Sequence, residues 1–180
     1  MGKSLFLTVI YVVCSLCYMA AQGLVNVKHY SVKDGMSQNT VQGVLQDNEG
    51  YIWMATWNGL EKFDGYSFKN YKTYPTDKVK LQYNRLVNLQ LGGNQMLVCQ
   101  SYDRRVYLFD IRRECFEDVF AYHPEVKLCT AASKIITLPN GMVWIVGTNG
   151  DLWRIDCFRY KDKGGLVYLP AHSDAERKRY

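Results

Sequence analysis

The chain has 180 residues, of which 48% are hydrophobic and 14% are aromatic, enough for one ordinary domain with an apolar core. Its formal net charge is +5, but three of the positive residues, Arg177, Lys178 and Arg179, stand at its C-terminal end, so the rest of the chain is close to balanced. We find no basic stripe of the kind that binds nucleic acid, and the charge therefore argues against a nucleic-acid partner for this segment.

The N-terminus has the layout of a secretory signal peptide over residues 1–21. Lys3 gives a positive start, an apolar run follows, and the small residues Ala20 and Ala21 precede Gln22. We expect cleavage there, which would export the rest of the chain to the periplasm. The apolar run is at the short edge of the ~20 residues that span a bilayer, so an uncleaved membrane anchor is the alternative.

From residue 34 onward, short strands and turns form three similar units, at about 34–74, 85–123 and 133–172. Each unit opens with an apolar strand and a Gly, Asn or Pro turn, as in TVQGVLQDNEG, RLVNLQLGGN and SKIITLPNG. Two strands joined by a polar turn follow: GYIWMATWNGLEKFD, NQMLVCQSYDRRVYLFD and GMVWIVGTNGDLWRID. These pairs end at equally spaced aspartates: Asp64, Asp110 and Asp156. A fourth strand closes each unit: YSFKNYKTY, CFEDVFAYH and GLVYLPAH.

These elements predict a β-propeller, because a unit of four short strands that repeats every ~40–50 residues is typical of a propeller blade. Residues 27–33, VKHYSVK, resemble FKNYKTY at 68–74 and therefore predict an outer strand ahead of the first blade. For residues 22–180 we predict an all-β fold: a partial β-propeller of about three four-stranded blades plus one N-terminal outer strand. A closed ring needs about four blades or more, so this propeller would be incomplete.

Four cysteines follow the expected signal peptide: Cys99, Cys115, Cys129 and Cys157. Export permits disulfides, and four cysteines allow three pairings. Because most of them lie in apolar, strand-like runs, we favour buried free thiols. The sequence contains no CxxC, no nearby His pair and no Asp-rich calcium loop, and we predict neither a metal site nor a cofactor.

Paired carboxylates suggest one enzymatic hypothesis, an exported lyase or hydrolase on a propeller scaffold. Asp47 and Glu49 lie two residues apart, and such a pair can perform acid–base catalysis. Asp47 and Asp64, however, stand at turn positions, where hydrogen bonds to backbone N–H groups explain them. The three histidines are scattered and accompany no recognisable nucleophile: His29, His123 and His172. We therefore predict no catalytic residue.

The turns between the second and third strands display side chains suited to sugar binding, which uses aromatic faces and polar groups. The candidate ligand-binding residues are Trp57, Asn58, Tyr102, Arg104 and Asn149. If these turns share one face of the propeller, they form a rim around a ligand. The alternative is that Trp57 packs on a neighbouring blade and that the other side chains are only solvated.

Residues 33–71, KDGMSQNTVQGVLQDNEGYIWMATWNGLEKFDGYSFKNY, are similar to the two-component-regulator propeller repeat. The matching positions are Gly35–Met36–Ser37, Asn39, Asp47, Gly50, Ile52–Trp53, Thr56, Gly59–Leu60, Asp64–Gly65, Phe68 and Tyr71. The third unit repeats the pattern as NGMVWIVGTNGDLWRID, whereas the second unit has Leu97 in the place of the tryptophan.

This resemblance implies the N-terminal part of a periplasmic sensor of the hybrid two-component systems of gut Bacteroidetes. In that family a signal peptide, two propellers and a β-sandwich precede a membrane helix, a histidine kinase, a receiver and a DNA-binding domain, and the sensors usually detect oligosaccharides. The resemblance implies that the chain recognises an oligosaccharide in the periplasm without catalysis of its own, with the remaining blades as partners. The alternative is a free-standing exported binding module that closes its ring with further copies of itself.

Overall fold

The computed structural model describes residues 2–3, 6–12, 27–77, 79, 81–129 and 131–171. The chain divides into two compact units, Met1–Tyr30 and Ser31–Tyr180. In the first unit, residues 2–3 and 6–12 are helical. Over the described residues, no helix combines the length and the apolar character needed to cross a membrane. The predicted signal peptide falls largely outside the described residues and stays a prediction.

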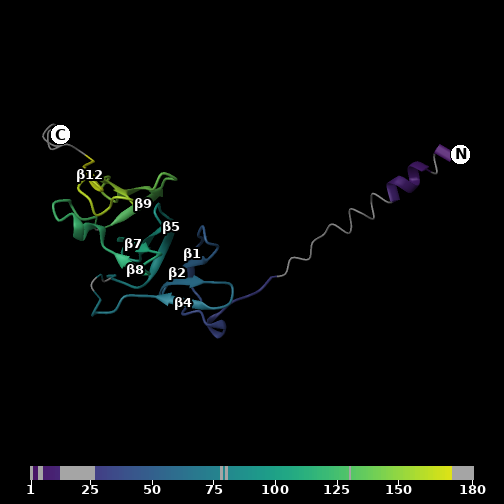
Figure 1. The fold of residues 1–180 in the computed structure, drawn as a ribbon, viewed down its shortest axis with the longest axis horizontal. Coiled ribbons are helices and arrows are strands. Elements are labelled where there is room, and N and C mark those ends of the chain that lie inside the picture. The colour runs from purple at the N-terminus through teal and green to yellow at the C-terminus, as the bar shows by residue number, and fades with distance from the viewer. Residues whose placement is uncertain are drawn as a thin grey trace. The chain divides into compact units, whose positions relative to one another are not determined.

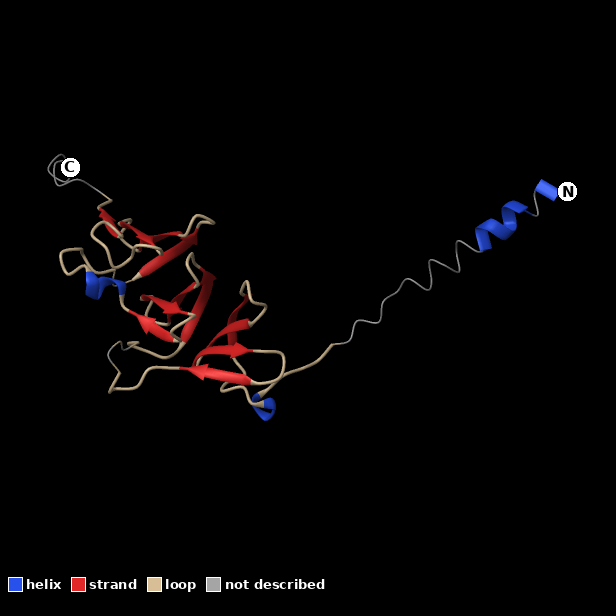
Figure 2. Cartoon of the chain, in the orientation of Figure 1, coloured by secondary structure: helices blue, strands red, loops and turns tan. Residues whose placement is uncertain are grey.

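The second unit consists of three antiparallel four-stranded sheets, in which neighbouring strands follow one another in the sequence (Figure 2). Blade 1 contains β1 (Val41–Gln46), β2 (Ile52–Thr56), β3 (Gly59–Phe63) and β4 (Phe68–Tyr71). Blade 2 contains β5 (Leu86–Leu91), β6 (Met96–Ser101), β7 (Val106–Asp110) and β8 (Cys115–Glu117). Blade 3 contains β9 (Ala132–Thr137), β10 (Met142–Gly147), β11 (Leu152–Asp156) and β12 (Leu166–Leu169). Figure 1 shows blade 2 between the other two, and the predicted fold class of three four-stranded blades is confirmed.

The predicted outer strand at 27–33 is not formed. Residues 27–31 have no regular structure, and Val32–Asp34 form a short 3-10 helix, η1. Ser31 and Asp34 cap this helix reciprocally, with the Ser31 N–H donating to Asp34 Oδ2 at 2.8 Å. An outer strand must pair with the third strand of a blade, and in each described blade that place is already taken by β4, β8 or β12.

The fourth strand of blade 2 is shorter than the sequence predicts. The segment 115–123 forms a strand only as far as Glu117, and Val119–Tyr122 then turn into a second 3-10 helix, η2. Asp118 precedes η2, and its Oδ1 accepts from the Phe120 N–H at 3.0 Å. This side-chain cap stabilises the turn in competition with continued strand pairing.

The strand registers correct one detail of the sequence alignment. The residue paired with the position just before the closing aspartate is Ile52 in blade 1 and Leu97 in blade 2. Leu97 therefore corresponds to Ile52, and Val98 occupies the place of Trp53. Alignment of the segments from their first residues pairs Leu97 with Trp53. The turn after β6 is longer than the turn after β2, so the residues of β6 lie one position earlier relative to blade 1 than that alignment places them.

Trp53 packs blade 1 against blade 2. Its ring is fully buried, with its centre 5.5 Å from that of Phe109 in blade 2 and 5.7 Å from that of Tyr71. Its Nε1 donates to Asp47 Oδ2 at 2.7 Å, while Asp47 Oδ1 accepts from two backbone N–H groups of its own turn. Asp47 therefore holds a turn and a core tryptophan, which accounts for this carboxylate without a catalytic role.

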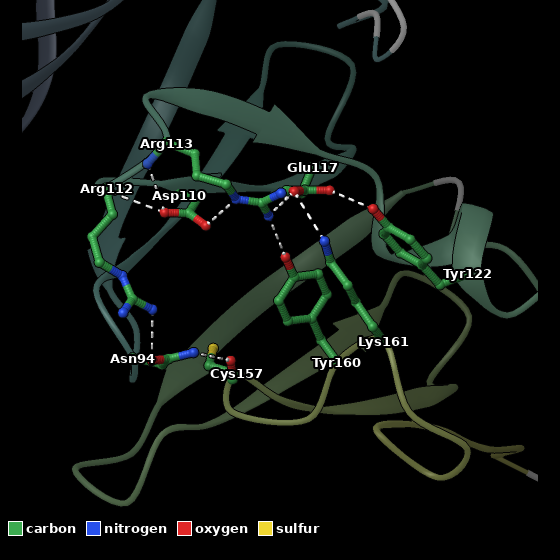
Figure 3. A network of polar contacts seen from close by, with 9 residues as sticks. All are labelled: Asn94, Asp110, Arg112, Arg113, Glu117, Tyr122, Cys157, Tyr160 and Lys161. Carbon is green, nitrogen blue, oxygen red and sulfur yellow. Dashed lines mark hydrogen bonds and ion pairs between the residues drawn. The ribbon is translucent and has the colours of Figure 1, made fainter.

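A polar network joins blades 2 and 3, as Figure 3 shows. Arg113, in the turn between β7 and β8, donates through Nε to Asp110 Oδ2 at 2.8 Å and through Nη2 to the Tyr160 hydroxyl of blade 3 at 3.1 Å. It also forms an ion pair with Glu117. The hydrogen bond to Asp110 raises the pKa of Arg113, so this guanidinium is fully charged and neutralised by its neighbours.

Glu117 is the second centre of the same network. Its side chain is buried, accepts from the Tyr122 hydroxyl at 2.8 Å and lies 3.4 Å from Lys161 Nζ of blade 3 (Figure 3). Because Arg113 and Lys161 both pair with it, its charge is matched within the network. This network therefore fixes one blade on the next in the same way as the aromatic core does between blades 1 and 2.

The four cysteines after the expected signal peptide are free thiols, three of them buried and Cys115 half-buried. Burial raises the pKa of the Cys129 and Cys157 thiols to about 11. Both are therefore protonated at neutral pH and lack the thiolate that reactive cysteines need. They contribute packing, as the sequence predicts.

Candidate ligand-binding site

A tight turn between β2 and β3 presents Trp57. The Asn58 N–H donates to Thr56 Oγ1 at 3.1 Å, and that hydroxyl donates to the Gly59 carbonyl at 2.9 Å. Gly59 has a φ of 109°, and a side chain there would collide with the Tyr71 carbonyl, so only glycine fits. The turn leaves the Trp57 side chain 41% exposed beyond the end of the sheet.

The corresponding turn of blade 2 presents Tyr102, which is 59% exposed. Ser101 Oγ donates to Asp103 Oδ1 at 2.5 Å, and the Arg104 N–H donates to the Ser101 carbonyl at 2.8 Å, which closes the turn. The Tyr102 N–H donates to the carbonyl of Arg85 at 2.8 Å. The turn is thereby tied to the residue that precedes β5.

Arg85 brings the two aromatic residues into one site. Its guanidinium carbon lies 3.5 Å from the centre of the Trp57 ring and 4.4 Å from the centre of the Tyr102 ring. We call these three residues the Trp57–Arg85–Tyr102 stack. Because Trp57 belongs to blade 1 and the other two to blade 2, the stack bridges the boundary between blades at the end that carries the β2–β3 and β6–β7 turns. We call that end the turn face.

Two aromatic rings position the guanidinium of Arg85, and no carboxylate of the described residues forms an ion pair with it. Its Nε is buried and has no hydrogen-bond partner among the described residues. The nearby carboxylate in the turn, Asp103, accepts from Ser101 and lies 3.4 Å from Arg105 Nε. The acid of this turn is therefore already paired with another arginine.

Sequence reasoning selected Trp57 and Tyr102 but missed Arg85. The structure brings Trp57 and Tyr102 together only through this arginine, which lies far from Trp57 in the sequence. The available signal was its place directly before the first strand of a unit, since that position and the turn after the second strand meet at one end of an antiparallel blade. Trp57 does contact the neighbouring blade, as the alternative held, yet 41% of its surface remains exposed.

The other three predicted residues have mainly local contacts. The Asn58 carbonyl accepts from Asn70 Nδ2 at 2.9 Å, and the Arg104 carbonyl accepts from the Ala132 N–H at 2.8 Å, which connects blade 2 to blade 3. Asn149 lies in the β10–β11 turn, where Oδ1 accepts from the backbone of the same turn. The structure gives these residues turn-forming roles and does not place them in the stack.

A carboxylate missed by sequence reasoning organises the turn face of blade 3. Asp151 Oδ2 accepts from Lys127 Nζ at 2.6 Å and from the Tyr168 hydroxyl at 3.0 Å, and Oδ1 accepts from the Ala171 N–H at 3.0 Å. The hydrogen bond from Lys127 comes first among the contacts that lower the pKa of Asp151. Both of its carboxylate oxygens accept hydrogen bonds, so this group is engaged in holding blade 3.

The opposite end of the blades contains an open cavity of about 530 Å³, bordered by the β1–β2, β5–β6 and β9–β10 turns. Its lining includes Glu49, Asn94 and Phe158. No group of three or more His, Cys, Asp or Glu side chains in the described part of the chain could hold a metal ion. The buried His123 places its Nε2 2.6 Å from the Tyr160 carbonyl and is occupied by that contact. We find no catalytic arrangement among the described residues; His172 lies outside them.

Comparison with known proteins extends the description. No family model matches the chain. A 54-residue segment, 30% of the chain, is 41% identical to part of "Histidine kinase P4" of Formosa agariphila. Two structures of the extracellular domain of BT4673 from B. thetaiotaomicron, described as a putative one-component and a putative hybrid two-component system, match 75% of the chain with a TM-score of 0.52 and 23% identity. The chain resembles the extracellular region of a two-component system.

The resemblance to this extracellular sensor region confirms the family likeness inferred from the propeller repeat. It extends over a small part of each relative: the chain covers 16% of the BT4673 domain and 4% of the histidine kinase. At 23% identity the structural match shows the fold alone, and the ligand is argued from the geometry of the site.

Proposed function

We propose that this chain is the ligand-sensing propeller segment of a two-component sensor and that it recognises an oligosaccharide on its turn face. The export signal predicted at residues 1–21 and the extracellular relatives support a location in the periplasm. Signalling would then be performed by parts of a longer protein, and this segment would contribute recognition without catalysis.

The observation that carries the proposal is the Trp57–Arg85–Tyr102 stack. Two exposed aromatic rings next to a fixed polar group are the combination that holds sugars, whose faces are apolar and whose edges donate and accept hydrogen bonds. The rings come from different blades, so a ligand that contacts both would favour one arrangement of those blades over others. Such a site could convert binding into a change in blade packing.

The direct test is isothermal titration calorimetry of the purified chain against a panel of plant and host oligosaccharides. For a saccharide that binds, we expect Trp57→Ala and Tyr102→Ala each to weaken the affinity about tenfold or more, by loss of aromatic contact of roughly 1–3 kcal/mol.

Tyr66→Ala is the matched control, because Tyr66 is 96% exposed in the β3–β4 turn, away from the stack. The Tyr66→Ala variant should bind the saccharide with the same affinity as the unmodified chain. Equal weakening by Tyr66→Ala and by the two stack variants, or no effect of either stack variant on a measurable affinity, contradicts the proposed site.

A further inference from the structure

We infer that the ligand of the turn face carries an oxyanion, a carboxylate or a sulfate, which binds Arg85 between Trp57 and Tyr102. The inference rests on the proposed function and deepens it, since it separates acidic oligosaccharides from neutral ones. It is carried by three observations: the geometry of the arginine, its missing partner and the charges around it.

The geometry prepares the guanidinium for a planar anion. The guanidinium carbon lies 3.5 Å from the centre of the Trp57 ring and 4.4 Å from that of the Tyr102 ring, so two aromatic rings hold this group in place. A guanidinium edge matches the two oxygens of a carboxylate or sulfate, and both hydrogen bonds can form together. Fixing the side chain in advance lowers the entropy lost when a ligand binds.

The missing partner distinguishes this arginine from two exposed cations of the described chain that form ion pairs. Arg113 has Asp110 and Glu117, and Lys127 has Asp151. The buried Arg85 Nε has no hydrogen-bond partner among the described residues. Because this Nε is enclosed, a ligand would reach the outer nitrogens of the guanidinium, where a bound anion would form charge-assisted hydrogen bonds.

The local charge favours the same ligand. The segment around the stack contains three arginines, Arg85, Arg104 and Arg105, and one carboxylate, Asp103, which lies beside Arg105. The unbalanced positive charge on the turn face would attract an anion and repel a cation. The exposed parts of the Trp57 and Tyr102 rings would remain for contact with the sugar that carries the anion.

A neutral sugar is the alternative occupant, because a hydroxyl can also accept from Arg85. A hydrogen bond between an ionised donor and a neutral acceptor is weaker than one in which both groups are ionised. The two ligands therefore differ in how much of their affinity depends on Arg85 and on ionic strength.

The test uses pairs of oligosaccharides that differ only in charge: oligogalacturonates and their methyl esters, and chondroitin fragments and their desulfated forms. Calorimetry on the full chain should show at least one acidic member binding about ten- to a hundredfold more tightly than its less charged match. Arg85→Gln should remove that difference, because it should weaken the binding of the acidic member much more than that of its less charged match.

Arg85→Lys and Arg112→Gln complete the design. The lysine keeps the charge but lacks the planar fork, so we expect it to restore only part of the preference for the acidic member. Arg112 lies in the β7–β8 turn at the opposite end, bonded to Asn94, and its variant should bind like the unmodified chain. Circular dichroism and the melting temperature establish that each variant is folded.

Each outcome separates the inference from the proposed function. If neutral sugars bind and acidic ones show no advantage, or if Arg85→Gln keeps the preference for the acidic member, the inference is wrong and the proposed function stands. If no saccharide of either kind binds, the proposed function fails, and the inference fails with it.

Discussion

Two arginines at opposite ends of the blades have opposite surroundings. Arg113 lies in a network in which Asp110, Glu117 and Tyr160 accept from its guanidinium (Figure 3). Arg85 lies against two aromatic rings, and its buried Nε has no protein acceptor among the described residues. The guanidinium of Arg113 has acceptors on both blades and joins blade 2 to blade 3. The guanidinium of Arg85 is held by aromatic rings but has no carboxylate partner among the described residues. The difference indicates which of these two arginines serves blade packing and which is available to a ligand.

The largest expected difference in stability is between variants of Trp53 and Trp57, which lie on the same β-hairpin. Trp53 is fully buried between blades 1 and 2 and bonded to Asp47, so Trp53→Ala should lower the free energy of unfolding by about 3–5 kcal/mol. Trp57→Ala loses mainly a contact with Arg85 and should cost about 1 kcal/mol or less. Urea denaturation followed by circular dichroism measures both. Similar losses for the two variants would mean that Trp57 belongs to the core.

The next largest expected difference in stability is between variants of Glu117 and Arg85. Glu117→Gln leaves Arg113 and Lys161 without their shared carboxylate and should destabilise the chain by about 2 kcal/mol. Arg85→Gln removes no protein ion pair and should cost less than about 1 kcal/mol. The same denaturation measurement decides between them. A larger loss of unfolding free energy for Arg85→Gln than for Glu117→Gln would show that the stack stabilises the fold.

The smallest effect is a dependence of stability on pH at the turn face of blade 3. The pKa of Asp151 is lowered in the folded chain, chiefly by Lys127, so its contribution to stability is present above the ordinary carboxyl pKa of about 3.9 and is lost as the pH falls through the folded value. Asp151→Asn should therefore flatten the fall in denaturation midpoint between about pH 5 and pH 2.

Asp64→Asn serves as a comparison, because Asp64 also has a lowered pKa but bonds only within its own exposed turn. It should change the pH profile less than Asp151→Asn does. Identical profiles for Asp151→Asn and the unmodified chain would contradict the role assigned to the Lys127 contact.

The sequence predicted the blades because their signals are local. Short apolar strands, glycine turns and the evenly spaced Asp64, Asp110 and Asp156 depend only on neighbours along the chain. The strand at 27–33 was predicted by similarity alone, and it does not form because strand pairing requires a partner edge. The register of blade 2 was misjudged at Leu97, because the length of the turn after β6 shifts the alignment.

The candidate site could be predicted only in part, for a physical reason. Exposed aromatic residues in turns are visible in the sequence, so Trp57 and Tyr102 could be nominated, and their role in binding stays a prediction. Arg85 was missed because its role depends on contacts across a blade boundary, between residues far apart in the chain. Asn149 looked like a ligand-binding residue, but asparagine in a turn also bonds to its own backbone, and the structure shows that contact.

The most direct test of the account follows the side-chain Nε–H signals of Arg85 and Arg113 by ¹⁵N NMR during titration with a bound acidic oligosaccharide. Arg85→Lys and Arg113→Lys assign the two signals by their disappearance. We predict that the Arg85 signal shifts with ligand concentration in step with the calorimetric affinity, because an anion bound to the guanidinium changes the surroundings of its Nε–H. The Arg113 signal should not move. Saturable binding with an unchanged Arg85 signal, or with a shift at Arg113 instead, would contradict the assignment of recognition to the Trp57–Arg85–Tyr102 stack.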